Sequence, residues 1–395
     1  MKTITLKMLG LAAMVSLAGC NDEETEKTMP EGTDEVTLAT DDIDITSQNM
    51  ANWTAYACRV ADLLAQDAAT LHADWEVSYK GGSGFATQFK QGNSAYPSAI
   101  SCVEQIVDGC ADIANEVGTA KIGEPRDLWE SSKYTEAVYA VESWYSYHSI
   151  EDYSNNIRSI QNAFYGSRDG RTEAAHSLAS YLLAHNAPLY TETKAAITAA
   201  IVAIENMAAP FRSHIGNSGV LAAMEACSAL EQVLSNKLKS YVTTLTTEEQ
   251  SEELKRIVEN YVDNVVMPTY VDLATCNRLL STAVAALRDN PSDAAFKAAA
   301  EAWMTARAPW ETSEAFLFGP VDEEGLDPNM DSWPLDQAAI ANILRTGDFS
   351  HLEYGQEAGE GEAEAAQNVR GFHTLEFLLF KDGKPRTVPQ ATSNQ

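Results

Sequence analysis

Most of this chain spaces its apolar and polar positions as helices do. Beyond residue 47, apolar residues recur every three or four positions in stretches rich in Ala, Leu, Glu and Lys, and two-residue alternation is rare. Gly and Pro interrupt the pattern at 80–84, 166–170, 289–291 and 319–320. We therefore predict an all-α fold. The expected helices lie near 47–78, 97–118, 127–164, 172–209, 217–246, 248–289, 292–318, 334–346 and 361–380.

The connections between these helices are short, which favours consecutive helices packed side by side in up-and-down bundles. The polar stretch at 243–249 offers a helix-capping signal and a seam between two helical halves. We therefore expect two four-helix-bundle domains, one over residues 47–247 and one over residues 248–390.

The first 46 residues follow a different pattern. Two lysines precede the apolar stretch 8–17, which leads into Leu-Ala-Gly-Cys, a small-residue cleavage site that closes on Cys20. This arrangement predicts a lipoprotein signal peptide over residues 1–19 and lipidation of Cys20. Residues 20–46 are acidic and poor in large apolar side chains, which predicts a flexible tether. We thus expect an exported protein anchored to a bacterial membrane, on the periplasmic or surface face of the outer membrane.

Composition narrows the class of partner. With 395 residues, 45% of them hydrophobic, the chain can bury substantial cores. A formal net charge of −30 repels phosphate backbones, so nucleic acid is not an expected partner, whereas cations are compatible ones. Acidity also keeps an exported protein soluble without any metal site.

The apolar stretch 368–380 contains one histidine and one glutamate, His373 and Glu376. Their three-residue spacing places both on one helix face. Because a buried carboxylate without partners is costly, we expect Glu376 to be paired, metal-bound or protonated. The pattern fits a metal-ligand or acid–base pair, and it fits equally well a core histidine bonded to a glutamate for structural reasons.

A second unusual stretch, 302–320, carries Arg307, Glu311 and Glu314 at helical spacing among aromatic residues. Such spacing usually marks a solvated face, but the aromatics favour partial burial. We select Glu314 as a candidate ligand-binding residue and Arg307 as its orienting partner.

A third stretch, on the predicted helix 127–164, places Glu142, Ser146, Ser149, Tyr153 and Asn156 on one face. If this row is buried, its oxygen and amide groups suit a hard cation or a small polar ligand; if exposed, it is a wet surface. We select Glu142, Ser146 and Asn156 as ligand-binding candidates.

Together these stretches resemble the imelysin superfamily, whose hallmark Gly-x-His-x-x-Glu is matched by Gly371, His373 and Glu376. The resemblance covers about residues 250–382, and more weakly 142–166. Its strongest segments are 265–270, 302–320, 331–334 and 370–376.

In this chain the segment at 142–166 precedes the histidine motif, whereas in the family it usually follows it. The resemblance therefore implies a circular permutation of two similar four-helix bundles, which preserves their packing. It also implies a site between them. That site combines His373 and Glu376 as metal ligands with Arg307, Glu314, Glu142, Ser146 and Asn156.

The family resemblance implies a role in iron uptake, peptidase activity or polysaccharide binding. We favour a non-enzymatic lipoprotein that binds iron or a related divalent metal and acts with iron-uptake transporter components. A zinc hydrolase usually needs three protein ligands and a general base, and one His-x-x-Glu pair supplies too few groups. A metallopeptidase is the alternative, and an oligosaccharide-binding lipoprotein is the third, because Trp303, Trp310, Trp333 and Tyr145 are available for sugar contacts.

Overall fold

The computed structural model describes residues 43–355 and 358–389, which are helical apart from short connections and one hairpin. The all-α prediction is confirmed. The predicted signal peptide, Cys20 and most of the predicted tether lie outside the described residues. The α-helices are α1 (Met50–Glu76), α2 (Phe85–Gln91), α3 (Ala99–Glu116), α4 (Gly123–Glu130), α5 (Tyr134–Tyr139), α6 (Ser149–Tyr165), α7 (Leu178–His185), α8 (Ala187–Glu205), α9 (Ser218–Gln232), α10 (Lys239–Val242), α11 (Glu248–Tyr261), α12 (Met267–Asp289), α13 (Asp293–Glu311), α14 (Pro320–Glu323), α15 (Leu326–Asp331), α16 (Gln337–Thr346), α17 (Glu360–Gln367) and α18 (Gly371–Leu379).

Shorter turns and one strand pair complete the fold. Strands β1 (Phe380–Lys381) and β2 (Lys384–Pro385) pair antiparallel directly after α18. The π turns are η1 (Val117–Lys121), η3 (Val233–Leu238) and η4 (Val262–Val266), and the 3₁₀ turns are η2 (Phe211–Ser213), η5 (Glu314–Phe316) and η6 (Ser350–Leu352).

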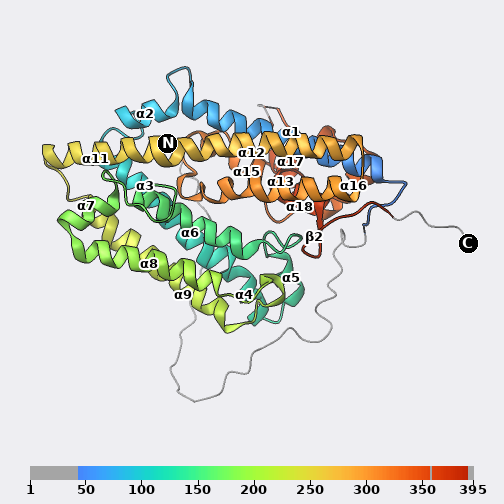
Figure 1. The fold of residues 1–395 in the computed structure, drawn as a ribbon, viewed down its shortest axis with the longest axis horizontal. Coiled ribbons are helices and arrows are strands. Elements are labelled where there is room, and N and C mark those ends of the chain that lie inside the picture. The colour runs from blue at the N-terminus through green and yellow to red at the C-terminus, as the bar shows by residue number, and fades with distance from the viewer. Residues whose placement is uncertain (1–42, 356–357, 390–395) are drawn as a thin grey trace, which may run out of the picture.

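One group of helices contains α1, α12, α13 and α18, which pack against one another (Figure 1). On α12, Leu273, Leu280 and Leu287 recur every seven residues and are fully buried, so they form the apolar stripe that such packing requires. The predicted division at residue 247 grouped residues 47–78 with the first domain. In the structure, helix α1 packs on α12 and α18, which lie far from it in sequence, and the division into domains stays a prediction.

A second group contains α3, α6, α8 and α9, drawn from teal through green to yellow-green below the first group in Figure 1. Helix α8 packs on both α6 and α9, and Ile197, Ile201 and Ile204 form its buried face. The start of α11 matches its prediction, because Thr247 and Gln250 form a reciprocal capping box at the expected seam.

The helix predicted over 127–164 is interrupted, and this is a correction. Helix α5 ends at Tyr139, and α6 begins only at Ser149. In the loop between them Ser143 and Tyr147 adopt positive φ angles of 50° and 63°, which a helix does not tolerate. Glu142 and Ser146 therefore lie in a loop, and the predicted polar row on a single helix face is wrong.

The two groups of helices meet where α13 packs on α6 and where η5 packs on α3 and α6. This approach is close: a Cβ atom at Gly109 of α3 would lie 2.3 Å from the carbonyl oxygen of Ala315. None of the helices in the described ranges combines the length and the apolar composition that crossing a membrane requires.

Candidate metal centre

Gly371 begins α18 and explains the first position of the Gly-x-His-x-x-Glu motif. Its φ is +80°, and a Cβ atom there would lie 2.4 Å from the carbonyl oxygen of Met330 in α15. A side chain at this position would therefore both strain the backbone and push α15 away. All nine residues of α18 are buried, so the motif sits in the core and not at the surface.

His373 and Glu376 form a completely buried pair on this helix. His373 Nδ1 lies 3.3 Å from Glu376 Oε2. The other oxygen, Oε1, accepts two hydrogen bonds of 2.7 Å from Ser146, one from its backbone N–H and one from its hydroxyl. The loop that contains Ser146 therefore places two hydrogen-bond donors, the Ser146 backbone N–H and hydroxyl, at a carboxylate 230 residues away in sequence.

The far side of the His373 ring faces Asp331 and Arg307. Nε2 lies 3.3 Å from Asp331 Oδ1 and 3.4 Å from Arg307 Nη2. Asp331 Oδ1 also accepts a hydrogen bond from Arg307, and Oδ2 accepts one of 2.7 Å from Trp310 Nε1. Burial alone would raise the pKa of Asp331, but the Arg307 guanidinium, with His373 contributing, holds it below its ordinary value.

Arg307 is fully buried and joins three carboxylates. Besides Asp331, it lies 3.4 Å from Asp152 through Nε and 2.6 Å from Glu311 through Nη2. Burial would lower its pKa, but these carboxylates outweigh burial and raise it. Arg307 is therefore a permanent positive charge at the centre of the cluster.

Glu311, Glu314 and Asp331 bring carboxylate oxygens to within 4.8 Å of one another, a spacing that allows one metal ion to be held among them. We call these three residues the acidic triad. Burial raises the pKa of Glu311 and of Glu314 well above the ordinary carboxyl value, although the cations Arg307 and Lys121 oppose the shift. The triad is thus costly to ionise without a further cation.

Several oxygen atoms at the triad have no hydrogen-bond donor. Glu311 Oε1 approaches Arg307 without hydrogen-bond alignment, and Asn156 Oδ1 is buried without a donor. Asn156 belongs to this site, because its Nδ2 donates a hydrogen bond of 2.5 Å to Glu311 Oε2. Among the described residues, no side chain or backbone group donates a hydrogen bond to the Glu314 carboxyl group, and Glu314 as a residue is 7% exposed. Unsatisfied buried acceptors are uncommon, and a bound cation would satisfy them.

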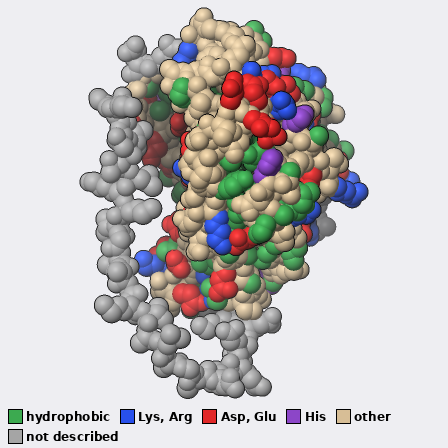
Figure 2. Space-filling view, turned by 90° about the vertical axis from the view of Figure 1, so that its left-hand side faces the viewer, with side chains coloured by type: hydrophobic (Ala, Val, Ile, Leu, Met, Phe, Trp, Pro, Cys, Tyr) green, Lys and Arg blue, Asp and Glu red, His purple; other side chains and the backbone are tan. Residues whose placement is uncertain are grey.

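Lys121 adds a second buried cation. It is 5% exposed, and its Nζ lies 3.1 and 3.2 Å from the two carboxylate oxygens of Glu142 and 3.7 Å from Glu116. Glu142 is 13% exposed and the Glu116 side chain 52% exposed, so this end of the cluster approaches solvent. The surface has acidic groups as well, but in the face shown in Figure 2 they lie in separate groups beside Lys and Arg.

The structure brings six of the seven ligand-site residues selected from the sequence into one cluster. One chain of contacts runs from Ser146 through Glu376 and His373 to Arg307. Another joins Asn156 to Glu311, whose carboxylate lies within 4.8 Å of that of Glu314. Glu142 is the exception: it contacts Lys121, whose charge acts on Glu314. Sequence reasoning did not select Asp331, Glu311, Asp152 or Lys121. Glu311 follows Arg307 by one helical turn, which was a usable signal; Lys121 lies in an ordinary Ala-rich stretch and offered none.

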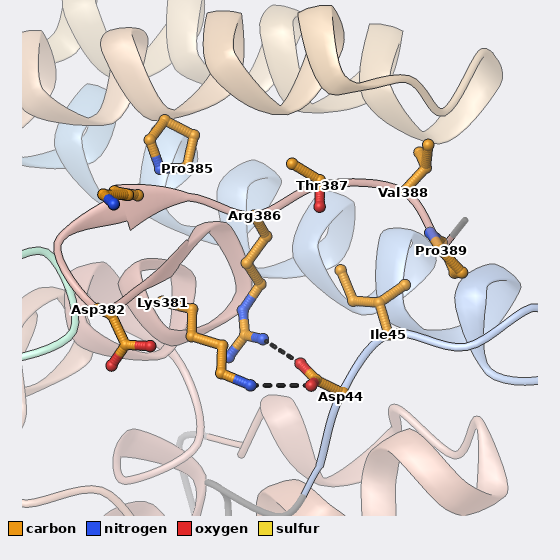
Figure 3. Close-up of a pocket in the computed structure, with 10 residues that line it drawn as sticks. Asp44, Ile45, Lys381, Asp382, Pro385, Arg386, Thr387, Val388 and Pro389 are labelled. Atoms are coloured by element: carbon orange, nitrogen blue, oxygen red, sulfur yellow. Dashed lines mark hydrogen bonds and ion pairs between the residues drawn. The ribbon is translucent and has the colours of Figure 1, made fainter.

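Two open cavities lie away from the triad. One, of about 430 Å³, is bounded by the β1–β2 hairpin, the segment after it and Asp44, which accepts bonds from Lys381 and Arg386 (Figure 3). The other, of about 180 Å³, lies between α2, α3 and α11. Neither is lined by His373 or by the triad, which is enclosed in the core.

The fold and the site define a class: a helical protein in which a buried His-x-x-Glu pair adjoins a carboxylate-rich cluster. The chain belongs to the Imelysin family, which matches residues 33–237 and 266–394. It is 53% identical to the protein described as an imelysin peptidase from Bacteroides ovatus, whose crystal structure matches 89% of this chain and 100% of that chain with a TM-score of 0.86.

A curated relative is similar over a shorter region. Iron-regulated protein A of Synechococcus elongatus is 30% identical over 171 residues, which are 43% of this chain. The match spans 39% of the length of that relative.

Proposed function

We propose that this protein binds a hard metal cation, with iron as the physiological metal, at the acidic triad of Glu311, Glu314 and Asp331. The observation that carries the proposal is the close spacing of three carboxylates, one of which, Glu311, keeps an oxygen without a hydrogen bond. Carboxylate and amide oxygens are the donors that hard cations prefer. Asn156 Oδ1 is a candidate fourth oxygen donor.

The charge balance supports the same conclusion. Five buried carboxyl groups belong to the network: Asp152, Glu311, Glu314, Asp331 and Glu376. Among the described residues, Arg307 and Lys121 are the permanent cations that act on them. A divalent or trivalent ion would compensate the excess negative charge, whose burial is otherwise costly.

In this proposal His373 and Glu376 support the site and do not ligate the metal. Both oxygens of Glu376 are already engaged by Ser146 and His373. Nε2 of His373 faces Asp331, so the pair of His373 and Glu376 orients one carboxylate of the triad. In metal sites, residues that contact the metal ligands orient those ligands in the same way. The sequence-based proposal of His373 and Glu376 as ligands is the competing assignment, and the variants below distinguish the two.

Iron enters through the relatives, because a protein similar to part of this chain is named for iron regulation. We propose further that the protein is exported, is held at a membrane by a lipid on Cys20, and acts with transporter components in iron uptake; the Leu-Ala-Gly-Cys cleavage site supports export. The two packed groups of helices are, in this proposal, the two four-helix-bundle domains, with the triad between them. The permuted order of the domains stays a prediction.

A metallopeptidase is the second candidate, favoured by the description of the similar Bacteroides ovatus protein as a peptidase. Against it stands the geometry of Glu376, whose carboxylate is buried and contacts Ser146 and His373, whereas a general base must reach a water molecule. The third candidate, oligosaccharide binding, draws on aromatic residues of which Trp303, Trp310 and Tyr145 are buried.

The test is titration of the metal-stripped protein with Fe²⁺ without oxygen, and with Mn²⁺ and Zn²⁺, by calorimetry. We expect the double variant Glu311→Gln/Glu314→Gln to weaken Fe²⁺ binding by at least about tenfold for the loss of two charged ligands. Glu301→Gln, an exposed change on the same helix, is the matched control and should bind as the parent does.

If the double variant binds every ion as tightly as the parent, the triad assignment fails. If only His373→Ala or Glu376→Ala abolishes binding, those residues are the ligands. Metal-dependent cleavage of a peptide library that disappears in Glu376→Gln would support the peptidase.

A further inference from the structure

The cavity beside the β1–β2 hairpin has more cationic than acidic side chains, although the chain as a whole carries a formal net charge of −30. The charged residues that line it are Lys381, Lys384, Arg386, Asp44 and Asp382. Its volume of about 430 Å³ lies in the range of small-molecule sites. A cationic cavity of this size in an acidic protein is suited to a small anion.

Arg386 forms the fixed side of this cavity. Its side chain is 5% exposed, and its guanidinium lies over the rings of Trp53 and Phe377, 4.8 and 5.0 Å from their centroids. Nε donates a hydrogen bond of 2.9 Å to the carbonyl oxygen of Phe377 in α18, and Nη1 donates one to Asp44. The guanidinium is therefore held in place before any ligand arrives, which lowers the entropic cost of binding one.

The chain itself places a carboxylate at this position. Asp44 lies before α1, and two cations share its oxygens: Lys381 through Nζ at 2.8 Å and Arg386 through Nη1 at 3.3 Å (Figure 3). The Asp44 side chain is 60% exposed and that of Lys381 43% exposed, so water reaches this contact. Because an exposed ion pair contributes little free energy, another carboxylate can replace Asp44 between the two cations.

The rest of the cavity wall is apolar. Ile45, Pro385, Val388 and Pro389 line it, and Ile45 and Val388 are partly buried against the core. Figure 3 shows Ile45, Val388 and Pro389 to the right of Arg386. A ligand with a carboxylate at one end and a short hydrocarbon body would meet the cations with the first and these apolar side chains with the second.

We propose that this cavity is a binding site for a small organic carboxylate, which displaces Asp44 from Lys381 and Arg386. The site is separate from the metal centre, because neither His373 nor the acidic triad lines the cavity. Asp44 is an internal competitor for the two cations. Ligand affinity is therefore lowered while the Asp44 carboxylate is in place, and it rises once that charge is removed.

The experiment measures the dissociation constant of butyrate by saturation-transfer NMR spectroscopy. In Asp44→Asn, we expect butyrate to bind about threefold to fivefold more tightly than in the parent, as for the loss of one exposed ion pair. Adding Lys381→Met to that variant should weaken binding by a similar factor, whereas adding Lys381→Arg should not. Asp272→Asn is the matched control, because Asp272 is also about half exposed and pairs with Arg168 away from the cavity.

Three outcomes overturn the proposal. One is unchanged or weaker butyrate binding by Asp44→Asn next to an unchanged control. Another is equally tight binding of inorganic phosphate, because the cavity would then select negative charge alone and not an organic carboxylate. The third is the absence of butyrate binding by both the parent and Asp44→Asn.

A second measurement locates the ligand and leaves Arg386 unchanged, because the bond from Arg386 to α18 also supports the fold. Crystals of Asp44→Asn are soaked in 4-bromobenzoate, whose bromine is found by its anomalous scattering. We expect the carboxylate at Lys381 and Arg386 and the bromine beside Val388 and Pro389. An empty cavity, or a bromine bound only elsewhere, overturns the assignment.

Discussion

Two regions of this molecule bury carboxylates in different ways. At the α18 pair, Glu376 accepts hydrogen bonds from Ser146 through one oxygen and contacts His373 through the other. At the acidic triad, Glu311 keeps an oxygen without a donor and burial raises the pKa of both Glu311 and Glu314. A carboxylate whose two oxygens are both engaged by protein groups has a structural role. A group of carboxylates with an oxygen that no donor reaches is suited to bind a ligand. Arg307 touches both regions.

The largest effect is expected where the two regions join. Arg307→Met would leave Asp331, Glu311 and Asp152 buried without their common partner, so we expect a loss of about 3–5 kcal/mol in the free energy of unfolding, as for other broken buried ion pairs. Urea unfolding of the metal-free protein measures it. Arg278→Met, an exposed change on α12, is the control and should shift stability by less than about 0.5 kcal/mol. A loss below about 1 kcal/mol for Arg307→Met would mean that the cluster does not depend on this charge.

The next effect concerns the backbone that places the α18 pair. Gly371→Ala combines a positive φ with a Cβ atom 2.4 Å from a backbone oxygen. We expect it to destabilise the protein by about 2–4 kcal/mol in thermal and urea unfolding. Gly361→Ala is the control, since nothing lies within 4 Å of its Cβ position. Parent-like stability of Gly371→Ala would contradict the tight approach of α15 to α18.

A pair of substitutions tests the comparison directly. Glu376→Gln can keep an oxygen toward Ser146 only by turning its NH2 group toward His373 Nδ1, and it removes the charge that these groups stabilise, so we expect the metal-free protein to lose about 1–3 kcal/mol. Glu314→Gln breaks no hydrogen bond and removes a charge that burial disfavours, so we expect a change within about 1 kcal/mol. If both variants lose the same free energy of unfolding, the α18 pair and the acidic triad do not differ in how their carboxylates are stabilised.

The smallest effect is the pH dependence at Asp327, one helical turn before Asp331. Burial first, and then the Asp331 carboxylate, raises the pKa of Asp327 from 3.8 to about 7. A carboxyl whose folded pKa is raised contributes stability that is fully present below pH about 4 and is lost as pH rises through about 7. We expect Asp327→Asn to flatten this part of the stability curve of the metal-free protein by about 1–2 kcal/mol between pH 4 and 8, a discounted value because the group is partly exposed. An unchanged slope would show that Asp327 is ionised at little cost.

The helical fold was predictable because apolar spacing is a local property. The period along α12 and the capping box at Thr247 and Gln250 identify helices without reference to the rest of the chain. The break between α5 and α6 was not predictable in this way. Residues 140–148 leave the helix, and Ser146 there donates two hydrogen bonds to Glu376 across the molecule, a contact that no local pattern reveals.

The candidate site divides in the same manner. The sequence by itself determined that His373, Glu376, Arg307 and Glu314 are polar residues in apolar helical surroundings, because burial of a charge violates a local pattern that one sequence reveals. Only the tertiary structure decided what those charges face. Asp331 reaches Arg307 and His373 from α15, and Lys121 pairs with Glu142 from η1. A charge interacts with whatever lies near it in space, whatever its distance along the chain.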